Sequence, residues 1–88
     1  MRDFKVEHEL GRKIKRLFKR DKQLCLALKN KMRQVLDDAD VKHYKNLRSP
    51  LNRFKRVHVK NFVLLFKYDA EKDAVSFHDF KHHDEVYK

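Results

Sequence analysis

The chain has 88 residues, enough for one small domain, because surface-to-volume scaling leaves a chain of this length a single modest core. Lysine and arginine number 23 against 13 acidic residues, and the net charge of +10 favours a polyanionic partner such as nucleic acid over a neutral substrate. No apolar run approaches the roughly 20 residues that cross a bilayer, and residues 1–6 lack the apolar core of a signal peptide. We therefore expect a cytoplasmic protein with no membrane partner.

The first half of the chain predicts a short strand followed by a helical hairpin. Phe4, Val6 and His8 alternate with charged residues, which is typical of a strand. Two apolar stripes with helical spacing follow, namely Leu10, Ile14, Leu17 and Phe18, then Leu24, Leu28, Met32, Val35 and Leu36. Asp21 lies between the stripes, where it can cap the second helix. Cys25 falls within the second helix, so we expect a buried rather than a reactive thiol.

The second half predicts three antiparallel strands. Residues 42–47 follow no period and carry no prediction. From about Arg53 the apolar residues recur at every second position, and residues 60–61 suit a hairpin turn. Residues 62–68 are nearly all apolar, as expected of a central strand, and a turn at residues 69–73 leads to the last strand.

This order predicts an α+β fold, in which an N-terminal strand and a two-helix hairpin pack on a small antiparallel sheet within a single domain, residues 1–88. Strand parity then assigns side chains to the two faces of the sheet. The face toward the helices should carry Val57, Val59, Phe62, Leu64, Phe66, Val75 and Phe77. The open face should carry Arg56, His58, Val63, Leu65, Lys67, Ser76, His78 and Phe80.

A long window between Asp40 and Asp69 contains no acidic residue. Its cations and histidines are Lys42, His43, Lys45, Arg48, Arg53, Lys55, Arg56, His58, Lys60 and Lys67. A merely solubilising surface mixes both signs of charge, so this window favours contacts with phosphates, which supply affinity but little sequence choice. An ordinary solvated face is the alternative reading.

Six histidines are many for so short a chain, and imidazole both accepts and donates protons near neutral pH. Four of them lie on or next to the open face of the predicted sheet: His58, His78, His82 and His83. RNA cleavage without a metal needs a base for the 2′-hydroxyl, an acid for the leaving 5′-oxygen and cations for the charged phosphorane. Two histidines with Arg56 and Lys60 meet that demand, although each histidine could equally be a surface residue without a catalytic part.

Two other readings of the C-terminal residues stay open. His78 and His82, with Asp79 or Asp84, could bind a metal, but their spacing matches no specific metal signature, so no metal is expected. Tyr87 could either anchor the tail in the core or stack on an unpaired base.

Three segments resemble the RelE/ParE toxin superfamily, in particular its RelE/StbE and YafQ-like branches. They are the helical hairpin up to Asp37, residues 56–67, and residues 82–87. The resemblance implies a toxin of a type II toxin-antitoxin system that cleaves messenger RNA in the decoding site of the ribosome, formed by 16S rRNA, through attack of the 2′-hydroxyl. It also implies a cognate acidic antitoxin as partner, and neither a metal nor a small-molecule cofactor.

The resemblance also implies residue roles. His58 matches the histidine of the Cys-His-Val strand of YafQ-like members, and His83 and Tyr87 match a late histidine or arginine and the aromatic residue four positions on. Lys60 falls where other members place a basic residue near the scissile phosphate. The catalytic candidates are His58, His83 and Tyr87; the phosphate-binding candidates are Arg56, Lys60, Lys45 and Lys67; and the secondary candidates are His43, His78, His82 and Arg53.

The chain departs from the family pattern at three positions. Val63 stands where members with a Tyr-Arg-hydrophobic-hydrophobic-Tyr strand place an arginine against the phosphate. Asn61 replaces an aspartate of the YafQ-like branch, and Lys45 lies near a position where that branch carries histidine, with His43 two residues away. A second hypothesis therefore stays open, a protein of the same fold that inhibits the ribosome or DNA gyrase without cutting. A general RNA-binding module is a weaker third hypothesis, because the chain lacks an RNP-type aromatic motif and a GXXG loop.

Overall fold

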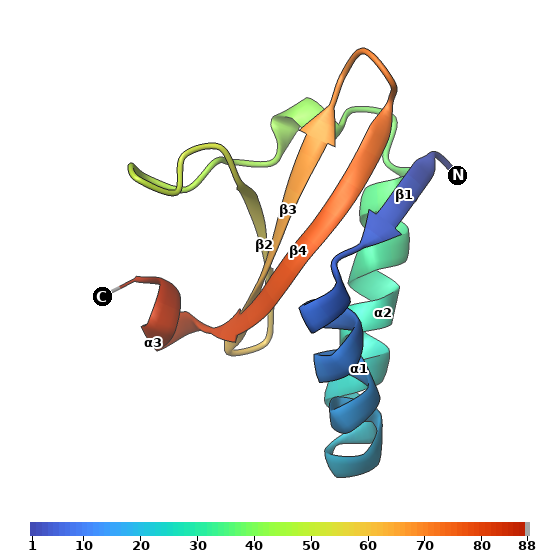
Figure 1. Cartoon of the computed structure of the whole chain (residues 1–88), viewed down its shortest axis with the longest axis vertical. Coiled ribbons are helices and arrows are strands. Elements are labelled where there is room, and N and C mark those ends of the chain that lie inside the picture. Colours follow the sequence, from blue (N-terminus) through green and yellow to red (C-terminus); the bar gives the residue numbers. More distant parts are fainter. Residues whose placement is uncertain (88) are drawn as a thin grey trace.

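The computed structural model describes residues 1–87 and has one four-stranded sheet with two long helices on one of its faces (Figure 1). The elements are β1 (Asp3–Val6), α1 (His8–Arg20), α2 (Lys22–Asp37), the 3₁₀ turn η1 (Val41–His43), β2 (Lys55–Val59), β3 (Phe62–Asp69), β4 (Ala74–His82) and α3 (His83–Val86). The strand order is β1-β4-β3-β2. The last three strands are antiparallel, as predicted, whereas β1 pairs in parallel with β4 and makes the sheet mixed. The predicted α+β fold is confirmed.

The helical hairpin begins and turns where the sequence predicts. The carboxylate of Asp21 accepts a hydrogen bond from the backbone N–H of Leu24 at 3.1 Å, which caps the start of α2. Cys25 is fully buried, as expected. Nowhere in residues 1–87 does a helix combine the length and the apolar character that a membrane span requires.

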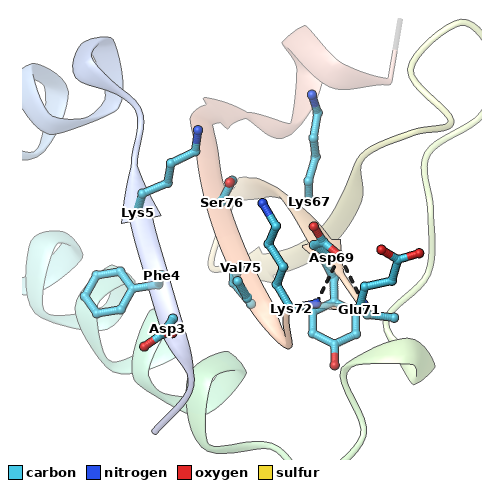
Figure 2. A pocket seen from close by; sticks show the side chains of 12 residues that line it. Asp3, Phe4, Lys5, Lys67, Asp69, Glu71, Lys72, Val75 and Ser76 are labelled. Atoms are coloured by element: carbon cyan, nitrogen blue, oxygen red, sulfur yellow. Dashed lines mark hydrogen bonds between the residues drawn. The ribbon is translucent and has the colours of Figure 1, made fainter.

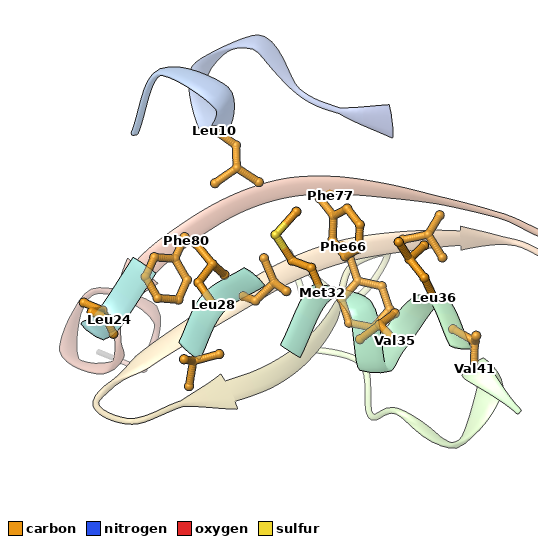
Figure 3. Packing of buried hydrophobic residues seen from close by; sticks show 13 residues of the cluster. Leu10, Leu24, Leu28, Met32, Val35, Leu36, Val41, Phe66, Phe77 and Phe80 are labelled. Carbon is orange, nitrogen blue, oxygen red and sulfur yellow. The ribbon is translucent and has the colours of Figure 1, made fainter. Parts of the chain in front are cut away.

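The main core lies between the helices and the sheet (Figure 3). Leu10 of α1 and Leu28 and Val35 of α2 meet Phe66 of β3 and Phe77 of β4, and all five side chains are fully buried. Burial of such a side chain contributes about 1.5–3 kcal/mol, so this core decides which face of the sheet the helices cover.

A β-bulge in β4 reverses the parity of its last residues. The pairing of β3 with β4 shifts by one residue between Leu65 and Phe66, which leaves His78 as the extra residue of β4. Phe80 therefore points toward the helices and is buried in the main core. The prediction that Phe80 lies on the open face is wrong, because counting alternate positions assumes a strand without an inserted residue.

The face opposite the helices is only partly open. Val63 and Leu65 lie on this face as predicted, but they are buried beneath the long loop before β2. Leu47 and Phe54 of that loop pack on them, joined by Val86 of α3. Figure 1 shows this loop and α3 on the same side of the sheet, away from α1 and α2. The remaining exposed surface on this side is where several of the predicted site residues lie.

Candidate functional site

Four of the predicted site residues meet where β2 faces α3. The ring centroids of His58 and His83 are 5.7 Å apart, and that of Tyr87 lies 6.0 Å from His58 and 4.5 Å from His83. The guanidinium carbon of Arg56 lies 5.4 Å from the centre of the Tyr87 ring. We refer to these four residues as the His58 cluster.

The position of α3 follows from hydrogen bonds to its first and last residues. The backbone N–H of His83 donates to the carbonyl of Asn61 at 2.8 Å, which ties the start of α3 to the turn between β2 and β3. The Nδ1 of His82 accepts from the backbone N–H of Asp84 at 3.2 Å, and the N–H of Tyr87 donates to the carbonyl of His83 at 3.1 Å. One helical turn therefore separates His83 from Tyr87 and places both on the same side of α3.

The electrostatic surroundings of His58 favour its neutral form. Partial burial lowers the pKa of His58 below 6.5, and the positive charges of Arg56 and His83 lower it further. The Nε of Arg56 is buried without a hydrogen-bond partner among residues 1–87. The cluster thus combines an imidazole suited to accept a proton with a guanidinium whose hydrogen bonding is incomplete.

A groove adjoins the His58 cluster. It has a volume of about 570 Å³ and is lined by residues 46–51 of the long loop together with Arg56, Val86 and Tyr87. We call it the 46–51 groove. Apart from Arg56 and Tyr87, its residues were not predicted as site residues, because the loop follows no sequence period and only the folded chain brings it beside α3.

Comparison with known proteins identifies the family. The chain is 44% identical over 89 residues to a Methanocaldococcus jannaschii protein provisionally named toxin RelE4, and the match covers all of this chain and 93% of that protein. The chain belongs to the RelE family of toxins. A Methanosarcina mazei protein of uncharacterised function is 38% identical over 84 residues, covering 94% of this chain and 95% of its own length. No family model matches the chain.

Solved structures share the fold of this RelE-family chain. Escherichia coli YafQ superposes with a TM-score of 0.72 at 17% identity, and each chain is fully covered. The toxin-antitoxin complex RelBE2 of Mycobacterium tuberculosis gives a TM-score of 0.75 at 17% identity, covering 92% of this chain and 90% of that one. The isolated E. coli RelE toxin gives a TM-score of 0.72 at 14% identity, and the match covers 93% of this chain and 84% of that one. At these identities the likeness shows the fold alone.

The predicted phosphate-binding lysines of this RelE-family chain occupy different parts of the surface. Lys60 is exposed in the β2–β3 turn with a φ of 55°, two residues after His58. Lys45 is exposed, and its carbonyl accepts from the backbone N–H of Arg56 at 2.9 Å, so it borders the cluster. Lys67 is farther along β3, with its ammonium 4.9 Å from the centre of the Phe54 ring.

Three predicted residues gather around Phe54 instead of joining the His58 cluster. The ring of His78 stacks on that of Phe54 with centroids 4.4 Å apart, and the guanidinium carbon of Arg53 lies 5.4 Å from the same ring centre. With Lys67, they form a second cationic group on the face away from the helices. His78 follows Phe77, which faces the helices, so His78 faces the loop as the strand parity predicts.

His82 does not share a face with His83. Its ring contacts Phe62 at 5.2 Å, and Phe62 packs against the main core on the helix side of the sheet. The prediction that His82 lies on or next to the open face is therefore corrected, because the bulge shifts its parity as well. Within residues 1–87, no three histidine, cysteine or acidic side chains gather in a way that could hold a metal ion.

His43 takes part in a contact at the end of α2. Its Nε2 lies 2.7 Å from Oδ2 of Asp38, and this hydrogen bond is the main reason that the pKa of Asp38 is lowered to about 2. Its ring packs on Tyr44, which in turn contacts Phe66 in the core. Figure 1 shows η1 at the opposite end of the sheet from α3, so His43 lies apart from the His58 cluster.

A basic row that the sequence did not reveal crosses the sheet near its other end. Lys5 of β1 pairs with Ser76 of β4, and Ser76 pairs with Lys67 of β3, so the three side chains lie side by side. They line a pocket of about 800 Å³ (Figure 2). Carboxylates also line this pocket, from Asp3, Asp69 and Glu71. Only the parallel pairing of β1 brings Lys5 into this row.

Proposed function

We propose that this RelE-family chain is the toxin of a type II toxin-antitoxin system that arrests translation in the cytoplasm by cutting messenger RNA in the decoding site of the ribosome, formed by 16S rRNA. The observation that carries the proposal is the meeting of His58 and His83, 5.7 Å apart, beside the guanidinium of Arg56. Two imidazoles and a cation on one surface are the groups that metal-independent attack by a 2′-hydroxyl requires.

In the proposed reaction His58 is the general base. Its lowered pKa keeps the imidazole neutral at pH 7, so it can take the proton of the 2′-hydroxyl. The 2′-oxygen then attacks the adjacent phosphorus, and the bond between phosphorus and the 5′-oxygen breaks. His83 in its protonated form gives a proton to that leaving oxygen, and the carboxylate of Asp84, 3.7 Å from its Nδ1, faces the positive charge. The products are a 2′,3′-cyclic phosphate and a 5′-hydroxyl.

Arg56 takes the part of the arginine that other family members carry at the position of Val63. Val63 is fully buried in a cluster with Leu47 and Phe54, so its side chain does not reach the surface. Arg56 lies on the neighbouring strand and belongs to the His58 cluster, where its charge stabilises the phosphorane. Tyr87 remains 38% exposed beside it, which supports stacking of its ring on a base of the substrate.

An acidic antitoxin is the second proposed partner. The net charge of +10 favours an acidic protein as well as RNA. RelBE2 of M. tuberculosis, which shares the fold, is a toxin-antitoxin complex. We expect the partner of this chain to be encoded beside it, and co-expression followed by affinity purification tests this expectation.

The decisive experiment is primer extension on messenger RNA after incubation with purified ribosomes and the chain. New 5′ ends should appear with the wild-type protein and only when ribosomes are present. They should be lost in His58→Ala and in His83→Ala but kept in His8→Ala, a matched change of an exposed histidine at the start of α1.

A second candidate function is favoured by Val63, which replaces the family arginine. In this alternative the chain inhibits the ribosome or DNA gyrase by binding without cutting. Translation arrest with intact RNA would support inhibition of the ribosome. Loss of supercoiling by DNA gyrase in the presence of the chain would support inhibition of gyrase.

A further inference from the structure

The 46–51 groove is a concave site of a size that small ligands fill. Its volume of about 570 Å³ falls inside the roughly 300–1,000 Å³ that is usual for ligand pockets. It opens beside Arg56 and Tyr87, two members of the His58 cluster. A ligand in the groove would therefore be in contact with the proposed catalytic surface.

The walls of the groove are mixed, with an apolar part that includes one aromatic ring beside polar and basic residues. Leu47, Pro50 and Val86 line it, and Leu51 is 40% exposed there although it is a large apolar residue. Tyr87 supplies the ring. A flat ring with polar edges, such as a nucleobase, fits walls of this kind because stacking and apolar contact do not depend on hydrogen-bond pairing.

The charge of the groove suits an anion. Arg48 and Arg56 line it, and no carboxylate does. Two other pockets each include carboxylates, from Asp3, Asp69 and Glu71 in one and from Asp37 and Asp38 in the other. Among these pockets, the 46–51 groove is the one in which a phosphate meets cations alone.

Hydrogen bonds hold the loop in place. Asn46 donates through Nδ2 to the carbonyl of Asn52 at 2.8 Å and accepts through Oδ1 from Nζ of Lys55 at 3.1 Å. The backbone N–H of Leu51 donates to the carbonyl of Arg48 at 3.0 Å. A loop held in this way loses little further freedom when a ligand binds, so it can discriminate between ligands by shape.

We infer that the 46–51 groove binds one nucleotide of the RNA strand next to the scissile bond, with the base between Leu51 and Tyr87 and the phosphate between Arg48 and Arg56. This inference rests on the proposed RNA-directed function and adds to it the part of the chain that selects the base. The loop between η1 and β2 is then the specificity element of the toxin.

The test is an NMR titration of the full chain with each of the four nucleoside 5′-monophosphates, with inorganic phosphate as a separate probe. Resonances of residues 46–51 and Tyr87 should shift, and at least one base should bind more tightly than phosphate. Arg48→Gln and Leu51→Ala should each weaken binding about tenfold, the size of one lost charged or apolar contact. Arg16→Gln on α1 and Leu26→Ala on α2 are matched exposed controls that should bind as the wild type does.

Equal binding of phosphate and nucleotides, shifts confined to another surface, or unchanged binding by both groove variants would overturn the inference. Because this assay does not need cleavage, its outcome is separate from that of the proposed function. Groove binding without RNA cleavage on ribosomes would remove the endonuclease proposal alone. If the chain cleaves RNA without binding nucleotides in the groove, the inference about the groove alone would be rejected. The same holds if Leu51→Ala leaves the pattern of cleaved codons unchanged.

Discussion

The imidazole ring of His58 lies 5.7 Å from that of His83, inclined by 32°, although one belongs to β2 and the other to α3. A substrate phosphate can therefore meet both rings at once. The pair depends on the hydrogen bond between the N–H of His83 and the carbonyl of Asn61, which fixes α3 to the hairpin turn.

Removal of either ring should abolish cleavage without unfolding the protein. We expect His58→Ala and His83→Ala to lower the cleavage rate about 10²–10⁴-fold, the usual contribution of general acid-base catalysis. Both side chains are exposed, so the free energy of unfolding should change by no more than about 0.5 kcal/mol. Primer extension and chemical denaturation measure the two effects. Full cleavage by His83→Ala would remove this residue from the mechanism.

Arg56 should contribute to catalysis while adding little to stability. Its buried Nε lacks a hydrogen-bond partner among residues 1–87, and such a nitrogen costs free energy on folding. We expect Arg56→Met to keep or raise the melting temperature and to lower cleavage about 10²–10³-fold, as when one donor to a charged transition state is lost. Arg56→Lys should cleave at an intermediate rate, because lysine keeps the positive charge but lacks the planar guanidinium group. Wild-type cleavage by Arg56→Met would contradict this role.

The pKa of His58 should be measurable below 6.5 and should depend on Arg56. Partial burial and then the neighbouring positive charges lower the pKa, so Arg56→Met should raise it toward 6.5. Histidine ring resonances followed by NMR over pH give both values. A His58 pKa at or above 6.5 in the wild type would exclude the proposed electrostatic arrangement.

The same shift predicts the pH dependence of stability. Because the folded chain binds a proton at His58 less readily than the unfolded chain does, stability should be unaffected by this residue above about pH 6.5. It should fall as the pH drops from 6.5 to the folded pKa and then level off. His58→Gln should remove this part of the decline, which urea denaturation at a series of pH values would reveal.

His43 should prove structural. We expect His43→Ala to leave cleavage unchanged, because its ring lies with Asp38 at the end of α2 and away from the His58 cluster. Loss of the hydrogen bond should raise the pKa of Asp38 from about 2 toward 3.8, which carboxyl NMR would detect. The stabilisation from this pair is present above pH 3.8 and is lost as the pH falls toward 2, so the variant should lack it. A cleavage defect in His43→Ala would show that the active surface reaches η1.

The row of Lys5, Ser76 and Lys67 should extend the RNA-binding surface. We expect Lys5→Gln and Lys67→Gln each to weaken binding of single-stranded RNA and to reduce the slope of log affinity against log salt by about one. Lys19→Gln, an exposed change on α1, should leave both unchanged. Unaltered slopes in the two row variants would indicate that the nearby carboxylates cancel their charge.

Much of the fold could be predicted from the sequence, because it depends on the spacing of apolar, capping and turn residues within short segments. The helical stripes, the Asp21 cap and the turn at Lys60 all appear where they were predicted. Each depends on residues a few positions apart, which is the range over which helix and turn preferences act.

What could not be predicted depends on contacts between distant segments. The bulge at His78 leaves no mark in the alternation of β4, yet it turns Phe80 and His82 to the helix side. Residues 42–47 show no period, so nothing indicated that Leu47 would cover the sheet. Sequence patterns assigned Arg56, His58 and His83 to one surface, but they left the position of Tyr87 open and did not indicate the groove beside the cluster.

The pairing of β1 with β4 joins the beginning of the described chain to its end. During synthesis, Phe4 leaves the ribosome long before its partner Val75 exists, and His83 and Tyr87 follow later still. The sheet edge and the His58 cluster can therefore assemble only after residues up to Tyr87 have emerged from the exit tunnel. Under the proposed function, a nascent chain would lack its active surface until those residues emerge, which leaves time for the proposed antitoxin to be present first.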